Sequence, residues 1–131
     1  MIFVNLPVKD LTASRAFFTA LGFAFDEEFS DDKAACVVLA DNIFVMLLRE
    51  DFFATFVNGE VADATRSTEV LSCISAESRE EVDALVRRAL EAGGKPWKDS
   101  FADGPMYGGS FQDLDGHVWE VMHMDAAANA H

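Results

Sequence analysis

The residue best suited to chemistry is Glu120, which stands inside the apolar run 117–124 near the end of the chain. Side chains alternate across a strand, so Glu120 would share one face with Val118 and Met122. Burying a bare carboxylate is costly unless it is paired, binds a cation or holds a proton. Glu120 is therefore a candidate ligand anchor or general base. The alternative is a structural salt bridge, or a position that faces water at a sheet edge.

Few other side chains could act together with Glu120. The only tyrosine, Tyr107, stands in a predicted glycine-bearing loop and is a candidate proton donor or, alternatively, a loop anchor. His123 follows Glu120 by three residues, and an odd spacing on a strand places the two on opposite faces. Cys36 and Cys73 have no second cysteine or histidine at metal-ligand spacing, so we expect both to be reduced. The catalytic candidates are Glu120 and Tyr107.

The first half of the chain predicts a strand, a helix and three further strands. Asp10 is a suitable N-cap, and Gly22 suits the left-handed residue that closes the helix between them. The pair Asp41-Asn42 tolerates positive φ in a hairpin turn. The strands are expected at 2–8, 23–29, 34–40 and 43–48.

The second half predicts the same order. Ser78 and Glu81 form a capping box ahead of a helix that stops before Gly93. A loop is expected over 102–109, and Asp115-Gly116 turns the closing hairpin. The strands are expected at 69–76, 95–101, 110–114 and 117–124.

The two halves can be aligned residue by residue. The hairpin turns begin at 41 and 115, and the same offset carries Met46 onto Glu120. The leading strands align at a smaller offset, Phe3 with Leu71 and Asn5 with Cys73. An internal repeat of this length predicts two β-α-β-β-β modules related by a pseudo-twofold axis, an α+β fold in which a mixed sheet forms a concave cleft. The side chains expected to line it and bind a ligand are Phe3, Asn5, Phe44, Met46, Leu71, Cys73, Glu120 and Met122.

The net charge of the chain limits the classes of partner that it can bind. The chain has 131 residues, half of them hydrophobic, and a formal net charge of −13. This charge repels phosphate backbones and anionic membrane surfaces, so we expect neither nucleic acid nor a membrane as partner. No segment is long enough to span a membrane and the first residues do not form a signal peptide, which predicts a cytoplasmic protein.

The length fits one domain built from both modules. We place module 1 at about 1–49, a linker or lid at about 50–68, module 2 at about 69–125 and a flexible tail at 126–131. The linker carries Phe52, Phe53 and Phe56, which suit a cover over a binding site, a contact surface or simple core packing.

The segment Phe111-Gln-Asp-Leu-Asp-Gly-His-Val-Trp-Glu120 resembles the closing signature of the vicinal oxygen chelate superfamily, which includes glyoxalase I, extradiol dioxygenases and bleomycin-resistance proteins. The opening Asn5-Leu-Pro-Val-Lys-Asp-Leu11, with Phe17-Phe18 and Leu21-Gly22-Phe23, also resembles it, as does the helix 81–94 with its Ala-Gly-Gly end. The resemblance covers nearly the whole chain. It implies paired modules and, commonly, a homodimer.

The resemblance also implies a divalent metal held by the first and fourth strands of each module, here at Phe3, Met46, Leu71 and Glu120. Only Glu120 can bind a hard cation, and catalytic sites normally need about three protein ligands. We therefore expect no cofactor, and Glu120 is the metal ligand if a divalent metal binds.

Two functions involving a small molecule remain open from the sequence, beside a third interpretation as a purely structural homodimer with no ligand of its own. The first is a glyoxalase- or bleomycin-resistance-like protein with a degenerate metal site, which binds a small organic molecule in an apolar cleft oriented by Glu120. The alternative is a lyase or isomerase related to lactoylglutathione lyase, or a dioxygenase-like enzyme, that uses Glu120 as metal ligand or general base.

Overall fold

The computed structural model describes residues 1–125, and the predicted tail 126–131 lies outside the described residues. The chain divides into two compact units, Met1–Asp63 and Ala64–His131.

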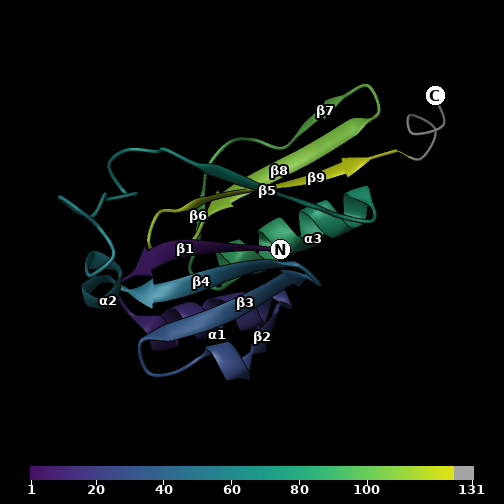
Figure 1. The fold of residues 1–131 in the computed structure, drawn as a ribbon. Helices are drawn as coiled ribbons and strands as arrows, with labels where there is room; N and C mark the ends of the chain where they lie inside the picture. Colours follow the sequence, from purple (N-terminus) through teal and green to yellow (C-terminus); the bar gives the residue numbers. More distant parts are fainter. Residues whose placement is uncertain (126–131) are drawn as a thin grey trace. The chain divides into compact units, whose positions relative to one another are not determined.

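The first unit is a mixed four-stranded sheet with the order β1-β4-β3-β2 (Figure 1). β1 pairs with β4 in parallel, and the other pairs are antiparallel. Helix α1 packs on β3 and β4. The elements are β1 (Ile2–Val8), α1 (Leu11–Leu21), β2 (Ala24–Asp26), the 3-10 turn η1 (Glu27–Phe29), β3 (Ala34–Ala40), β4 (Ile43–Arg49) and α2 (Glu50–Ala54).

The ends of α1 follow local chemistry. The Ala13 N–H donates to Asp10 Oδ1 at 3.0 Å, and Gly22 closes the helix with a φ of 102°. Phe17 and Phe18 are buried on the inner side of the helix. The predicted helix bounds are confirmed, because caps act within one turn and need no distant partner.

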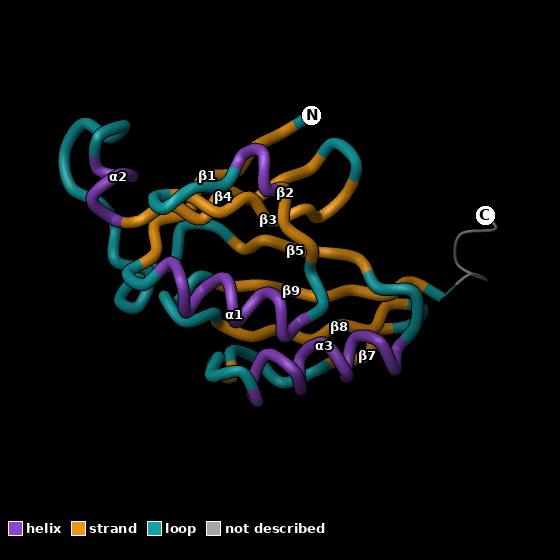
Figure 2. The backbone as a smooth tube through the Cα atoms, turned by 90° about the horizontal axis from the view of Figure 1, so that it is seen from below, coloured by secondary structure: helices purple, strands orange, loops and turns teal. Residues whose placement is uncertain are grey.

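The second unit is a five-stranded mixed sheet with the order β5-β9-β8-β6, and β7 also pairs with β8. β5 and β9 are parallel, as β1 and β4 are in the first unit. Helix α3 runs along β8 (Figure 2). The elements are β5 (Leu71–Ser75), α3 (Arg79–Glu91), β6 (Lys95–Pro96), β7 (Phe101–Asp103), β8 (Met106–Gln112) and β9 (Val118–Met124).

The loop predicted over 102–109 is wrong, because most of it is strand: β7 reaches Asp103 and β8 begins at Met106. The two neighbouring glycines of this segment, Gly108 and Gly109, are required by close packing. A Cβ on Gly109 would lie 2.9 Å from a Val86 methyl of α3, and one on Gly108 would collide with the Met122 sulfur. Both glycines therefore allow neighbouring groups to approach the backbone of β8.

The turn between β8 and β9 is organised by Asp113, which is buried. Its Oδ1 accepts from the N–H groups of Asp115 and His117 at 3.0 Å, and its Oδ2 accepts from Trp119 Nε1 at 3.1 Å. Burial raises the pKa of Asp113, while His117 and the Trp119 hydrogen bond act in the opposite direction. One carboxylate thus ties the hairpin turn to the largest side chain of the core.

The strand registers support the internal repeat. Asn5 lies beside Met46 in the first unit, and Cys73 lies beside Glu120 in the second. The two sequence offsets predict that Asn5 corresponds to Cys73 and Met46 to Glu120, so the equivalent residues pair in the same way in both units. The predicted α+β class is confirmed, and the structure gives each unit a mixed sheet of its own.

Candidate functional site

The sheet of the second unit has two different faces. Gly109 approaches Val82 and Val86 of α3, so Trp119 and Val121, which are its neighbours by register and alternation, lie on the helix side. The opposite side carries the alternate residues, and we call it the Glu120 face. It is defined by Leu71, Cys73 and Ser75 of β5, Val118, Glu120, Met122 and Met124 of β9, and Met106, Gly108, Ser110 and Gln112 of β8.

Glu120 lies at the centre of this face and is half-buried. Its register partners are Cys73 on one side and Ser110 on the other. The Ser110 hydroxyl is engaged with the backbone of Lys98, accepting from its N–H at 3.1 Å. Cys73 senses the Glu120 charge: desolvation raises the pKa of the Cys73 thiol, and the Glu120 charge raises that pKa further. Cys73 is therefore a protonated thiol at neutral pH.

The Glu120 carboxylate makes no hydrogen bond or ion pair with any residue of the described part, 1–125. The predicted alternative of a structural salt bridge is therefore not realised among these residues. A half-buried carboxylate without a partner retains lone pairs for a donor from outside the chain.

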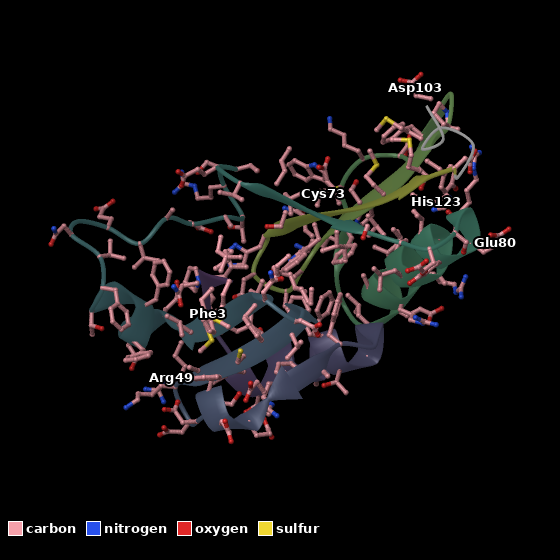
Figure 3. All side chains as sticks on the ribbon, turned by 45° about the vertical axis from the view of Figure 1, so that its right-hand side comes forward. Phe3, Arg49, Cys73, Glu80, Asp103 and His123 are labelled. Carbon is pink, nitrogen blue, oxygen red and sulfur yellow. The ribbon has the colours of Figure 1, made fainter. Side chains whose placement is uncertain are left out.

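A hollow of about 510 Å³ lies further along β9, and its lining does not include Glu120. Met122 belongs both to this hollow and to the Glu120 face. The hollow is lined by Ser75, Ala76, Glu77, Met106, Met122, His123 and Met124. Figure 3 shows sulfur atoms gathered near the label of Asp103, where β7 turns into β8.

Sequence reasoning missed part of this lining. Alternation along the last strand already placed Met124 on the side of Glu120, so that signal was available. Met106 gives no such signal, because the proline and glycines around it predict a loop and not an alternating strand. Ser75 and Glu77 join the hollow only because β5 lies beside β9.

Tyr107 is not brought together with Glu120. Its hydroxyl donates to Asp83 Oδ1 at 2.6 Å, on the helix side of the sheet. The hydrogen bond to Asp83 raises the pKa of Tyr107, so the phenol keeps its proton. The guanidinium of Arg79 lies over the ring at 5.3 Å. These contacts join Tyr107, which lies in β8 and not in a loop, to α3.

The first unit places its predicted ligand-binding residues together on one face of its sheet. Phe3 stacks on Phe44 with ring centroids 4.9 Å apart, and Asn5 lies beside Met46 by register. Phe29 of η1 contacts the edge of Phe3 at 5.9 Å. The second unit likewise brings Leu71, Cys73, Glu120 and Met122 together.

The predicted lid contains a helix, α2, followed by turns and coil. Phe52 meets Phe56 edge to face at 5.1 Å, and the Lys33 ammonium lies 5.4 Å from the Phe52 ring. Phe56 is 70% exposed. α2 contacts β1 and β4 of its own unit.

The residues at the superfamily's metal positions do not fit a divalent ion. Phe3 and Leu71 have no donor atom, and the sulfur of Met46 is a poor ligand for hard cations. Within residues 1–125, no three histidine, cysteine, aspartate or glutamate side chains are grouped as a metal site would require. Glu120 alone cannot supply the three ligands that a catalytic centre normally uses.

Comparison with known proteins agrees with this architecture. A family profile described as "Bleomycin resistance protein-like N-terminal" matches residues 1–39. The hypothetical protein SA1046 from S. aureus is 29% identical, with a TM-score of 0.82, and the match covers 94% of this chain and 92% of that one. The chain has the vicinal oxygen chelate fold. The resemblance drawn from the sequence motifs is thus confirmed.

Two further relatives of this fold have descriptive names. A glyoxalase-related enzyme from Fulvimarina pelagi is 22% identical, with a TM-score of 0.80 and coverage of 94% and 86%. The fosfomycin resistance protein FosX from Listeria monocytogenes is 19% identical, with a TM-score of 0.68 and coverage of 97% and 94%. These likenesses concern the fold. No curated protein matches the sequence.

The described part of the chain contains no helix that is both long and apolar enough to cross a membrane.

Proposed function

We propose that the protein binds a small organic molecule on the Glu120 face, with the Glu120 carboxylate orienting the ligand and Leu71, Cys73 and Met122 supplying contact area. One observation carries the proposal: a half-buried carboxylate without a partner in the described chain stands on a largely apolar face, and Met122 of the same face also lines a hollow. Small-molecule sites are typically concave and mostly apolar, with a few polar groups that set orientation.

The chemistry of the face suggests the ligand class. A hollow of about 510 Å³ lies within the usual range of small-molecule sites. The Glu120 carboxylate can accept hydrogen bonds, Glu77 lines the hollow, and the net charge of −13 disfavours anions. The expected ligand is therefore largely apolar and carries an ammonium, amidine, hydroxyl or N–H group that donates to Glu120. Resistance proteins named for bleomycin and fosfomycin share this fold, which supports a small-molecule ligand.

The face of the first unit that carries Phe3, Asn5, Phe44 and Met46 is proposed as a second contact surface for ligand. The stacked rings offer flat apolar area, and Asn5 offers both a donor and an acceptor. We further expect a cytoplasmic homodimer. Light scattering of the purified protein measures the assembly state directly.

The test is a ligand screen with a matched charge control. Glu120→Gln keeps the shape of the side chain and removes its charge, and Glu80→Gln removes an equal charge from the exposed surface of α3 in the same unit. A charge-assisted hydrogen bond contributes about 1.5–3 kcal/mol, so Glu120→Gln should weaken cationic hits by roughly 10- to 100-fold. Glu80→Gln should bind like the parent. Equal binding by all three proteins would remove Glu120 from the site.

A second candidate is a lyase or isomerase in which Glu120 removes a proton beside a carbonyl. The same unpaired carboxylate favours it, because a general base needs free lone pairs within reach of substrate. Turnover of hemithioacetals that disappears in Glu120→Gln and persists in Glu80→Gln would support it. Absence of turnover by the parent across such substrates would leave the binding role alone.

A further inference from the structure

Three of the five methionines of the chain line the same hollow of the second unit. Met106 lies directly across from Met124 in the antiparallel pairing of β8 and β9, and Gly108 lies across from Met122. These four positions are the corners of a rectangle on one face, about 5 Å across the strands and about 7 Å along them. Three corners carry a thioether, and the fourth carries no side chain.

Because Gly108 has no side chain, the methionine sulfurs can approach one another at this position. A Cβ on Gly108 would collide with the Met122 sulfur and with the Phe101 ring, so the Met122 side chain reaches across onto β8, where Met106 also stands. A methionine side chain has three rotatable bonds and adapts its sulfur position at low cost. Three thioethers around corners this close can converge on one ion.

We propose that Met106, Met122 and Met124 form a binding site for a soft monovalent cation of the Cu(I) or Ag(I) type. Thioether sulfur is a soft donor that selects such ions over the hard divalent metals of the superfamily positions. The three donors are neutral, while Glu77 lines the same hollow and the chain carries a charge of −13, so the surroundings attract a cation.

The other donors nearby are engaged or turned away. His123 contacts the Ala76 carbonyl oxygen through Nδ1 at 3.0 Å and Asp125 Oδ1 through Nε2 at 3.4 Å. Cys73 lies beside Glu120 and does not line the hollow. The ligand set is therefore three thioethers. Because thioethers carry no dissociable proton, cation affinity should change little between pH 5 and 8, whereas a histidine ligand would lose affinity at the acid end.

This site goes beyond the proposed function, although it shares Met122 and the hollow with it. An apolar ligand uses the methionines as contact area, whereas a soft cation uses their sulfur lone pairs. Met→Leu substitutions separate the two roles, because leucine keeps nearly the same apolar volume and has no donor.

The experiment uses Ag(I) as a redox-inert probe of the Cys73→Ser protein, which removes the exposed thiol as a competing ligand. Methionines carry a ¹³C label on the ε-methyl group and are assigned by single Met→Leu variants. One equivalent of Ag(I) should shift the signals of Met106, Met122 and Met124 and leave those of Met1 and Met46 unchanged. Competition against bicinchoninate under anaerobic conditions then measures Cu(I) affinity.

The matched comparison is between Met106→Leu or Met124→Leu and Met46→Leu, which lies in the first unit. Outer-shell changes at metal sites cost about 10- to 100-fold in affinity, so loss of a direct donor should cost at least about tenfold. Met46→Leu should have no effect. Equal Ag(I) affinity in the triple leucine variant, or shifts confined to Met1 and Met46, would overturn the proposal. Binding of an organic ligand that survives in the leucine variants bears only on the Glu120 site, so the two proposals fail separately.

Discussion

Asp113 provides the sharpest test of how the second unit is held together. In Asp113→Asn the amide oxygen still accepts from the two turn N–H groups, but the amide nitrogen replaces Oδ2 and presents a donor to Trp119 Nε1–H at 3.1 Å. Trp119 is 1% exposed, so its N–H finds no water. A lost hydrogen bond to a charged group with a buried donor left over costs about 1.5–3 kcal/mol, and we expect about 2 kcal/mol.

A double-mutant cycle distinguishes the loss of the hydrogen bond between Asp113 and Trp119 from a general effect of removing the Asp113 charge. Trp119→Phe removes the donor together with part of the core, and we expect it to cost about 2–4 kcal/mol. In the double variant the amide nitrogen introduced at position 113 no longer faces an N–H donor. The loss in free energy of unfolding should therefore be smaller than the sum of the two single losses by about 1–2 kcal/mol. Asp41→Asn, at the equivalent exposed turn of the first unit, is the control and should change stability by less than about 0.5 kcal/mol.

The assay is chemical denaturation at pH 8, followed by far-UV circular dichroism because Trp119→Phe removes a fluorophore. The free energy of unfolding is taken from the linear extrapolation for each of the five proteins. Additive costs within about 0.5 kcal/mol would show that Asp113 and Trp119 do not depend on each other and would refute this account of the turn.

Three further changes have defined outcomes. Because the Glu120 charge raises the pKa of Cys73, Glu120→Gln should lower that pKa and speed alkylation by iodoacetamide at pH 8; an unchanged rate would mean that the two groups do not interact. Ser78→Ala removes the α3 N-cap and should cost about 1 kcal/mol in denaturation, with Ser78→Thr close to the parent. Gly109→Ala should cost about 1–3 kcal/mol through overpacking, and Val86→Ala in the same chain should recover part of that loss, which an unrelated cause of destabilisation would not allow.

Most of the first unit was predictable because its signals are local. Asp10 and Gly22 bound α1 as expected, and the turn at 41–42 separates β3 from β4 as expected. The second unit was harder. Gly108 and Gly109 resemble a loop in the sequence, whereas the structure uses them where Phe101, Met122 and α3 approach the backbone. A glycine needed for space and a glycine needed for positive φ look alike in one sequence.

The candidate site also has some features that follow from local sequence rules and others that depend on the tertiary structure. Alternation along a strand is a local rule, so the sequence by itself determined that Glu120 and Met122 share a face and that His123 does not. The repeat offsets also predicted that Asn5 corresponds to Cys73 and Met46 to Glu120, and the strand registers then showed that each first-strand residue lies beside its fourth-strand partner.

Tertiary structure alone decided which groups Glu120 and the methionines meet. The pairing of β8 with β9 places Met106 across from Met124, and the packing of α3 draws Tyr107 to Asp83. Such contacts join residues far apart in the chain, and their register depends on the whole sheet. The sequence therefore determined the modules and the face of Glu120, and the packed sheet decided that its carboxylate has no partner in the described chain and that three thioethers share one hollow.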